Sequence, residues 1–441
     1  MARPLLWLAL LCASLTFTAS AAIHLELIHV DAKENRTVAE RMRRATERTR
    51  RRLASMVDVT APVHWVETQY IAEYLIGDPP QQAEAIIDTG SNLVWTQCSA
   101  CGAAGGCFSQ NLFYYDPSRS STIRPVACND TACALGSETR CTSGNKTCAV
   151  LTAYGAGAIA GALGTEVFTF GSQNVSLAFG CIIATKITPG SLDGASGIIG
   201  LGRGALSLVS QLGETKFSYC LTPYFSDAVN TSHLFVGASA ALSGNAPVTS
   251  VPFVKNPNDL VFGTFYYLPL AGITVGKTKL DVPATAFDLR QVASGQWAGT
   301  FIDSGSPFTS LVDVAYQALR AELARQLGAS VVPPPAGTRR FDLCVAAAQR
   351  DASKLVPPLV LHFGSGGGGG ASDLVVPPEN YWGPVDDTTA CMVVFSSAGP
   401  NTTLPTNETT IIGNYMQQNM HLLYDLGSGV LSFQTADCST M

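Results

Sequence analysis

Most of the chain alternates short apolar runs with turn-forming residues, and few stretches repeat with the period of a helix. Strand-like runs occupy residues 69–76, 84–87, 165–170, 266–275 and 429–433. The clearest helical period lies in residues 312–327, where Leu319, Leu323 and Leu327 fall on one face. The Pro-rich residues 333–335 and the Gly-rich residues 366–370 are expected to be loops. The pattern predicts a mostly β protein with a few short helices.

One arrangement of apolar runs occurs twice. Ile-Ile-Asp-Thr-Gly-Ser at residues 86–91 resembles Phe-Ile-Asp-Ser-Gly-Ser at residues 301–306. Each copy is followed, at nearly the same distance, by an apolar-apolar-Gly element that ends at Gly200 or Gly413. Such matched spacing predicts a duplicated lobe. We expect an N-terminal lobe at residues 67–245 and a C-terminal lobe at residues 246–441, joined in a Gly-, Ala- and Ser-rich stretch.

The N-terminus carries the marks of a secreted precursor. A basic start, an apolar run over residues 5–17 and the small residues 19–21 predict a signal peptide at residues 1–22. Residues 23–66 follow, and within them the arginine-rich stretch at residues 36–53 suits an exposed basic helix. A solvated basic helix is one interpretation, but a basic propeptide held by charge against an acidic body is favoured. The secretory pathway then leads to the extracellular apoplast or to the vacuole.

Composition excludes several classes of protein. Hydrophobic residues make up 46% of the chain and charged residues only 14%, which rules out a disordered solvating chain. The net charge is −6 and the positive charge gathers near the N-terminus, so the body has no basic stripe for nucleic acid. Beyond the N-terminus, no apolar stretch approaches the roughly 20 residues that span a bilayer. We expect a monomer with no nucleic-acid or membrane partner.

Cysteine usage agrees with an oxidising compartment. Twelve of the 13 cysteines follow the predicted signal peptide, and seven of them fall in residues 98–148, which predicts a disulfide-stapled insert. The Cys98-x-x-Cys101 pair could also be half a zinc site or a redox pair, but no matching pair at zinc spacing follows it. Sequons make candidate glycosylation sites of Asn35, Asn129, Asn145, Asn174, Asn230, Asn401 and Asn407.

The repeated Asp-Thr/Ser-Gly motif predicts a pair of carboxylates. A strand delivers Asp88 or Asp303 to a turn, where Gly90 or Gly305 brings a backbone N–H to the carboxylate. The following hydroxyls, Ser91 and Ser306, can bond the outer carboxylate oxygens. Two such carboxylates in contact share one proton, so one can take a proton from water while the other polarises a peptide carbonyl. This chemistry needs no metal, no other cofactor and no covalent intermediate.

At this point the chain resembles the pepsin-like aspartic proteases, specifically the plant nepenthesin-type group. The resemblance covers residues 68–438 and includes both Asp motifs, Trp95, the Cys-rich insert, the Gly-Leu-Gly-Arg-Gly run at residues 200–204 and residues 411–419. It implies a bilobal double-barrel β fold with a cleft between the lobes, polypeptide substrates, and a propeptide that acts as an intramolecular inhibitor. The basic N-terminal segment resembles the propeptides of that group.

The resemblance also implies roles for single residues. Asp88 and Asp303 match the catalytic pair, and Tyr154 matches the tyrosine of a flap that closes over substrate. We expect the Tyr154 phenol to share a hydrogen bond with the Trp95 indole. Ala156 and Ala158 stand where the group usually has Asp and Ser, so two polar flap residues are missing. The implied disulfides are Cys98–Cys101, Cys107–Cys181, Cys128–Cys148, Cys133–Cys141, Cys220–Cys438 and Cys344–Cys391. The alternative function is a catalytically weak or inactive binding protein on the same fold, similar to xylanase inhibitors.

Overall fold

The computed structural model describes most of the chain after residue 69 and two segments before it. The described residues are 22–29, 37–44, 69–103, 106–141, 144, 146–154, 157–188, 191–225, 231–336, 338, 341–364, 372–399 and 402–441. The predicted signal peptide therefore lies outside the described residues except for Ala22, as does most of the predicted propeptide. Among the described residues, no helix is long and apolar enough to cross a membrane.

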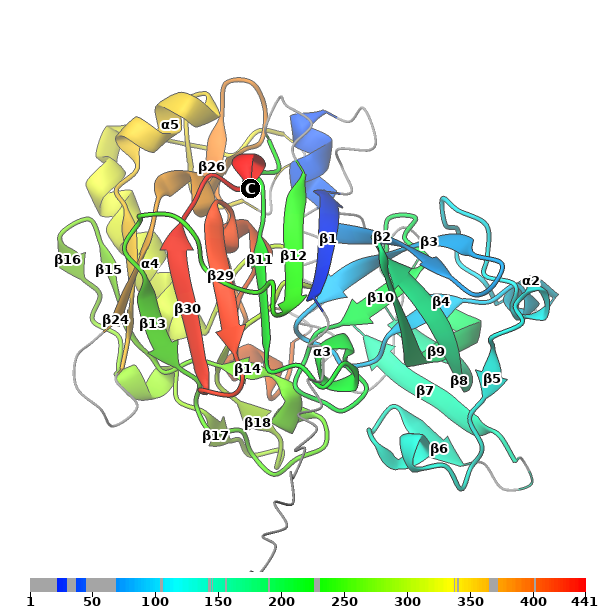
Figure 1. The fold of residues 1–441 in the computed structure, drawn as a ribbon. Coiled ribbons are helices and arrows are strands. Elements are labelled where there is room, and N and C mark those ends of the chain that lie inside the picture. Colours follow the sequence, from blue (N-terminus) through cyan, green and yellow to red (C-terminus); the bar gives the residue numbers. More distant parts are fainter. Residues whose placement is uncertain are drawn as a thin grey trace, which may run out of the picture.

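A sheet built from both halves of the chain runs through the middle of the molecule (Figure 1). The strand β11 (Lys216–Cys220) lies between β12 (Ser232–Gly237) and β29 (Met420–Asp425), and β30 (Val430–Thr435) and β13 (Thr249–Pro252) continue the sheet beyond β29. On the other side, β12 pairs antiparallel with β1 (Ala22–His29). Alternate residues of β1 are buried, as expected for a strand with one face on a core.

The strand β1 was not expected, because the first strand was predicted at residues 69–76 and the basic helix at residues 36–53. Its apolar side chains Ile23, Leu25 and Leu27 are fully or almost fully buried in the main core. It also pairs with β2 (Tyr70–Ile76), so it joins the two parts of the largest sheet. Part of the predicted propeptide is therefore an integral strand of this structure.

The N-terminal lobe continues this sheet beyond β2. In spatial order the strands are β3 (Gln81–Asp88), β10 (Gly197–Gly200), β4 (Trp95–Gln97), β9 (Gln173–Ile187), β8 (Gly157–Phe170), β7 (Cys148–Tyr154) and β6 (Thr139–Cys141), with β5 (Arg124–Pro125) beside β8. Two one-turn helices, α2 (Ala100–Ala103) and α3 (Leu208–Gln211), lie in its connections. The long hairpin of β8 and β9 forms one wall of this lobe (Figure 1).

The C-terminal lobe has smaller sheets. The strands β14 (Tyr266–Tyr267), β19 (Thr300–Ile302), β28 (Thr410–Ile412), β20 (Ser310–Leu311) and β27 (Phe395–Ser396) form the sheet that carries the second Asp motif. A second sheet joins β16 (Thr278–Lys279), β15 (Leu270–Val275), β23 (Leu359–Phe363) and β24 (Ser372–Val376). The remaining pairings join β21 (Val331–Val332), β22 (Cys344–Val345), β26 (Ala390–Met392) and β25 (Trp382–Pro384), and β17 (Arg290–Gln291) with β18 (Trp297–Ala298).

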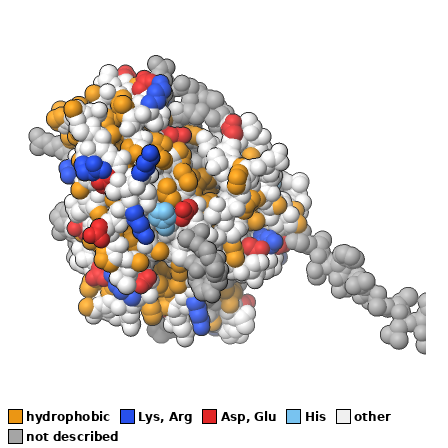
Figure 2. All heavy atoms as spheres, turned by 90° about the vertical axis from the view of Figure 1, so that its left-hand side faces the viewer, with side chains coloured by type: hydrophobic (Ala, Val, Ile, Leu, Met, Phe, Trp, Pro, Cys, Tyr) orange, Lys and Arg blue, Asp and Glu red, His pale blue; other side chains and the backbone are white. Residues whose placement is uncertain are grey.

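The predicted helix at residues 312–327 is confirmed as α4 (Asp313–Leu327). Leu319, Leu323 and Leu327 are buried as the period requires, together with Ala315 and Tyr316. The other helix of this lobe, α5 (Gln349–Leu355), is shorter. One face of this lobe intersperses basic, acidic and apolar side chains, and no large area of one charge gathers among the side chains coloured there (Figure 2).

The repeat is also visible in the pairing of the strands. Strand β3 runs parallel to β10 with Asp88 opposite Gly200, and β19 runs parallel to β28 with Ile302 opposite Ile412. Each Asp motif therefore follows a buried strand whose parallel neighbour is the predicted return element. The internal duplication read from the sequence is a duplication of this local unit.

Six disulfides are formed, and four of them differ from the pairs that the resemblance implied. Cys220–Cys438 and Cys344–Cys391 are present as expected. The other four are Cys98–Cys181, Cys101–Cys107, Cys128–Cys141 and Cys133–Cys148. They replace the expected Cys98–Cys101, Cys107–Cys181, Cys128–Cys148 and Cys133–Cys141. The spacing of the cysteines along the sequence could not decide which of them pair. Even in the folded insert, Cys133 Sγ lies only 3.8 Å from Cys141 Sγ, to which it is not bonded.

Strand pairing explains the bridge between Cys98 and Cys181. Cys98 directly follows β4, which pairs parallel with β9 where Thr96 lies opposite Cys181, so the chain already holds these cysteines together. Cys98 is bonded to Cys181 and Cys101 is bonded to Cys107. These two bridges exclude the zinc and redox interpretations of the Cys98-x-x-Cys101 pair. Within the described part of the chain, no group of three or more His, Cys, Asp or Glu is placed to hold a metal.

Two of the candidate glycosylation sites are exposed, namely Asn129 and Asn174. Asn407 is half-buried, and its side-chain oxygen is enclosed. The remaining candidates, Asn35, Asn145, Asn230 and Asn401, lie outside the described residues.

Candidate active site

Asp88 stands at the end of β3, where the chain turns sharply. The Gly90 N–H donates to Asp88 Oδ1 at 3.0 Å, and the Ser91 hydroxyl donates to Oδ2. The Leu201 N–H donates to the Asp88 carbonyl oxygen at 2.8 Å, which ties the turn to the return strand β10. The carboxylate is therefore aimed by its own turn, as the sequence predicted for Gly90 and Ser91.

Asp303 is held in the same way after β19. The Gly305 N–H donates to Asp303 Oδ1 at 2.8 Å, and the Ser306 hydroxyl donates to Oδ2 at 2.7 Å. Asn414 supports this turn, because its side-chain amide donates to the Ser304 carbonyl at 2.8 Å. Both Asp residues are buried, at 1% and 0% exposure, so each depends on these hydrogen bonds in place of water.

Two hydroxyls that sequence analysis did not single out join the turns across the lobes. The Thr89 N–H donates to Ser304 Oγ at 3.0 Å, and the Ser304 N–H donates to Thr89 Oγ1 at 2.9 Å. The Ser304 hydroxyl donates onward to the Ile87 carbonyl at 3.0 Å. The signal was present in the sequence as a hydroxyl at the second position of both motif copies. This reciprocal pair fixes the two Asp turns against each other.

The position of Gly305 shows that the carboxylates converge. A Cβ on Gly305 would lie 2.2 Å from Asp88 Oδ1 and 3.2 Å from Asp303 Oδ1. Only a residue without a side chain can therefore stand between them. Two carboxylates that share one enclosed site cannot both ionise easily, and they are suited to hold one proton between them.

A buried tyrosine pair packs behind the Asp303 turn. The Gln417 amide donates to the Asp303 carbonyl at 3.3 Å, and its side-chain oxygen accepts from the Tyr219 hydroxyl at 2.5 Å. Tyr219 also lies 2.7 Å from the Tyr424 hydroxyl. Burial, reinforced by the charge of Asp303, raises the pKa of Tyr219 well above its ordinary value, so this support stays neutral.

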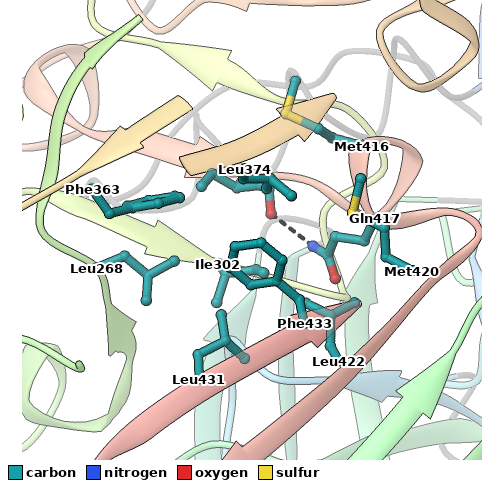
Figure 3. A pocket seen from close by; sticks show the side chains of 11 residues that line it. Leu268, Ile302, Phe363, Leu374, Met416, Gln417, Met420, Leu422, Leu431 and Phe433 are labelled. Atoms are coloured by element: carbon teal, nitrogen blue, oxygen red, sulfur yellow. Dashed lines mark hydrogen bonds between the residues drawn. The ribbon is translucent and has the colours of Figure 1, made fainter. Parts of the chain in front are cut away.

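Gln417 also borders a small apolar cavity inside the C-terminal lobe (Figure 3). Its amide turns toward the backbone and donates to the Ile412 carbonyl at 2.9 Å, while Leu, Ile, Phe and Met side chains line the rest. Ile302, which directly precedes Asp303, reaches the same space. Such an apolar lining identifies a packing defect beneath the Asp303 turn and not a binding site for a polar peptide.

The hairpin of β7 and β8 carries Tyr154 at its described end, opposite Gly157. The Tyr154 ring packs against Trp95 with 5.9 Å between ring centroids. The two rings were expected to share a hydrogen bond, but the buried Trp95 indole nitrogen has no hydrogen-bond partner among the described residues. Ala158 lies opposite Ala153 in this hairpin. Ala156, the other alanine expected in the flap, lies outside the described residues.

The N-terminal segment reaches this site. Residues 38–44 are helical, and Arg41 donates to the Tyr224 carbonyl at 3.1 Å. At the start of the N-terminal lobe, the Gln69 amide donates to the Gly305 carbonyl at 2.9 Å, within the Asp303 turn. The expectation of an exposed basic helix is wrong for Arg44, which is 3% exposed and pairs with buried Asp193 at 3.0 Å. Composition could not indicate this, because the partner comes from another part of the fold.

Comparison with known proteins agrees with this geometry. The family described as Xylanase inhibitor N-terminal matches residues 70–238, and the one described as Xylanase inhibitor C-terminal matches residues 265–435. Aspartic proteinase nepenthesin-1 of Nepenthes gracilis is 36% identical over 424 residues, covering 93% of this chain and 89% of the relative. The chain belongs to the pepsin-like aspartic protease family.

Other members of the family extend the comparison. Aspartyl protease family protein 2 of Arabidopsis thaliana is 32% identical over 448 residues, covering 95% of this chain and 86% of the relative. Among solved structures, edgp has a TM-score of 0.66 at 18% identity, covering 95% of this chain and 96% of that one. Basic 7S globulin from soybean has a TM-score of 0.63 at 16% identity, with 94% and 97% covered. At these identities the two structures show the shared fold alone.

Proposed function

We propose that this chain is a secreted aspartic endopeptidase, made as a zymogen, which hydrolyses peptide bonds of polypeptide substrates in acid. One observation carries the proposal: two Asp turns, each bonded by its own Gly N–H and Ser hydroxyl, converge on Gly305. Residues 67–245 and 246–441 are the two lobes in this proposal, with the substrate between them. The names of the relatives as aspartic proteinases support it.

The chemistry follows from a dyad that holds one proton. The ionised Asp takes a proton from a water molecule as the water oxygen adds to the carbonyl carbon of the substrate. The other Asp gives its proton to the carbonyl oxygen, which makes a tetrahedral diol. The C–N bond then breaks as the leaving nitrogen takes a proton from the dyad and the diol returns one. One water is consumed, an acid and an amine leave, and the dyad ends singly protonated.

The zymogen proposal rests on the N-terminal segment. Strand β1 fills a place in the central sheet, Arg41 bonds the Tyr224 carbonyl and Arg44 pairs with Asp193. Tyr224 in turn bonds Asn414, which supports the Asp303 turn, so the segment that carries these arginines occupies space that a substrate would need. Acid weakens the attraction of the basic segment for the acidic body, because it protonates carboxylates. After release, the mature enzyme acts in the apoplast or the vacuole.

The test is proteolysis by purified, acid-treated protein. We expect it to cleave a denatured protein, and a peptide library across about pH 2–7, with inhibition by a statine-type transition-state mimic. Chelators and serine or cysteine reagents should have no effect. The family names also describe a xylanase inhibitor, so inhibition of a xylanase is measured in parallel. Xylanase inhibition without any cleavage would replace the protease proposal with the inhibitor alternative.

The flap assignment makes its own prediction. If Tyr154 closes over bound substrate, Tyr154→Ala should lower kcat/KM by about 10- to 100-fold, because an interaction of the closed complex is lost. Tyr154→Phe keeps the ring that packs on Trp95 and serves as the matched control. Thermal unfolding of both variants separates loss of packing from loss of closure. Unchanged kinetics in Tyr154→Ala would show that the flap is wrongly assigned, while the Asp assignment would stand.

A further inference from the structure

We propose that Asp193 is a specificity-determining residue that binds a cationic side chain, Arg or Lys, of the polypeptide substrate. The inference rests on the proposed function, because it names a subsite of the same catalytic centre. In this structure the site is filled by a cation from the chain itself. Arg44 Nη2 lies 3.0 Å from Asp193 Oδ1, and both side chains are only 4% exposed.

Asp193 is fixed in place by its own turn. Its φ of 53° lies in the left-handed region, which Asp and Asn tolerate better than most residues. The Ala195 N–H donates to the Leu192 carbonyl at 2.9 Å, and the Asn111 N–H donates to the Gly194 carbonyl at 2.7 Å. All of these bonds are made within residues 106–225, so none of them depends on the segment that carries Arg44. The carboxylate therefore keeps its position when that segment leaves.

The turn lies on the flap side of the dyad. Leu192 belongs to the same buried cluster as Trp95 and Tyr154. The strand that follows the turn, β10, ends with Gly200 opposite Asp88. A side chain held by Asp193 would thus belong to a peptide that runs beneath the flap.

The segment that carries Arg44 marks a path between the lobes. Arg41 bonds the Tyr224 carbonyl, and the Tyr224 hydroxyl bonds Asn414, which supports the Asp303 turn. Met42 packs against Gly383 of the C-terminal lobe, since a Cβ there would lie 2.2 Å from its terminal methyl group. Residues 41–44 therefore reach from the Asp303 side to Asp193. A substrate that replaces them in the same space meets the same carboxylate.

The surroundings favour a cation over a neutral group. The Asn111 amide, which lies against Gly194, donates to Glu84 Oε1 at 3.1 Å, and Glu84 is 2% exposed. A second carboxylate is thus buried close to Asp193 and adds to the negative potential. A neutral substrate side chain in the place of Arg44 would bring no compensating charge to this buried carboxylate, which is costly. Arg and Lys, by contrast, restore the pair seen with Arg44.

The experiment compares peptides that differ in one charge. Activated enzyme is given pairs of peptides in which one position carries Arg or its neutral isostere citrulline, and that position is scanned along the peptide. The assay is run at about pH 5, above the ordinary pKa of Asp. At one position we expect kcat/KM for Arg to exceed that for citrulline by about 10- to 100-fold, as for a hydrogen bond to a charged group. In Asp193→Asn the ratio should fall to about one.

The controls make the outcome specific. Asn is chosen because it tolerates the positive φ of Asp193. Asp425→Asn removes a half-buried carboxylate that pairs with Lys216, and this variant should keep the wild-type ratio. Each ratio is measured within one enzyme, so differences in activation cancel. A wild-type ratio near one at every position, or a ratio that persists in Asp193→Asn, would overturn the inference. No cleavage of any peptide by wild-type enzyme would count against the proposed function instead.

A second measurement needs no variant enzyme. A synthetic peptide of residues 37–44 is added as an inhibitor, with either Arg or citrulline at the last position. If Asp193 binds the cation, the Arg peptide should inhibit wild-type enzyme about tenfold more strongly. Equal inhibition by the two peptides would also overturn the inference.

Discussion

Asp88→Asn and Asp303→Asn are each expected to lower kcat by about 10³-fold or more. An Asn side chain cannot take a proton from water or give one to the substrate carbonyl, and general acid–base catalysis is worth about 10² to 10⁴ in rate. In the proposed mechanism one Asp acts as base while the other acts as acid, so neither can take over the role of the other. The measurement is peptide hydrolysis by the acid-activated variants.

The same variants should remain folded. The Asn side-chain oxygen can still accept from the Gly N–H at the Oδ1 position, and the Asn amide N–H can donate to the Ser hydroxyl oxygen at the Oδ2 position. Circular dichroism and thermal unfolding check this, and Asp342→Asn is the matched control, because it removes only one partner of an exposed ion pair with Arg320. Substantial activity in either dyad variant would contradict the mechanism.

The parts of this site that are local in sequence could be predicted from it. A buried strand, a Gly and a hydroxyl suffice to define how Asp88 and Asp303 are held, because the bonds span only two or three residues. The return strands were predictable because the duplication repeats them at a matched distance. Likewise the three leucines of α4 mark its buried face through the helical period alone.

The parts that depend on distant partners could not be predicted. The Thr89–Ser304 pair requires the two lobes to meet in one orientation, which no local pattern encodes. Arg44 looked like one of many solvated arginines until the fold placed Asp193 beside it. The pairing of the cysteines in the insert could not be predicted either, because several sulfur atoms lie close enough together to form more than one set of bridges.

The precursor is expected to be inactive near neutral pH and to gain about 100-fold or more in activity after acid treatment. A histidine chain supplies part of the pH dependence. A ring nitrogen of His24, on β1, lies 2.9 Å from a ring nitrogen of His233, on β12. His421, on β29, lies near His233. Burial, followed by the charge of His24, lowers the pKa of His233; burial, followed by His233, lowers that of His421 to about 4. Glu26 opposes the shift at His233.

The sign of the effect follows from proton counting. When β1 leaves the sheet, β12 loses its neighbour and His233 can reach water, where the pKa of a histidine is about 6.5. Because burial lowers the pKa of His233 in the docked state, the released state binds more protons below about pH 6.5, so falling pH favours release. The docked strand is thus stable above about pH 6.5 and is progressively lost below it.

His233→Gln should retain the docked strand to lower pH. Gln can still bond His24 but cannot be protonated, so the extra proton that His233 takes up on release is lost. Activation at about pH 5 should therefore be slower in His233→Gln than in the unsubstituted precursor. His362→Gln is the matched control, because His362 pairs with Asp373 on β24, away from β1. Activation is followed by the N-terminal sequence and by peptide cleavage.

A precursor that is fully active at neutral pH would contradict the zymogen proposal. An unchanged activation profile in His233→Gln would instead assign the acid response to the carboxylates that face the basic segment.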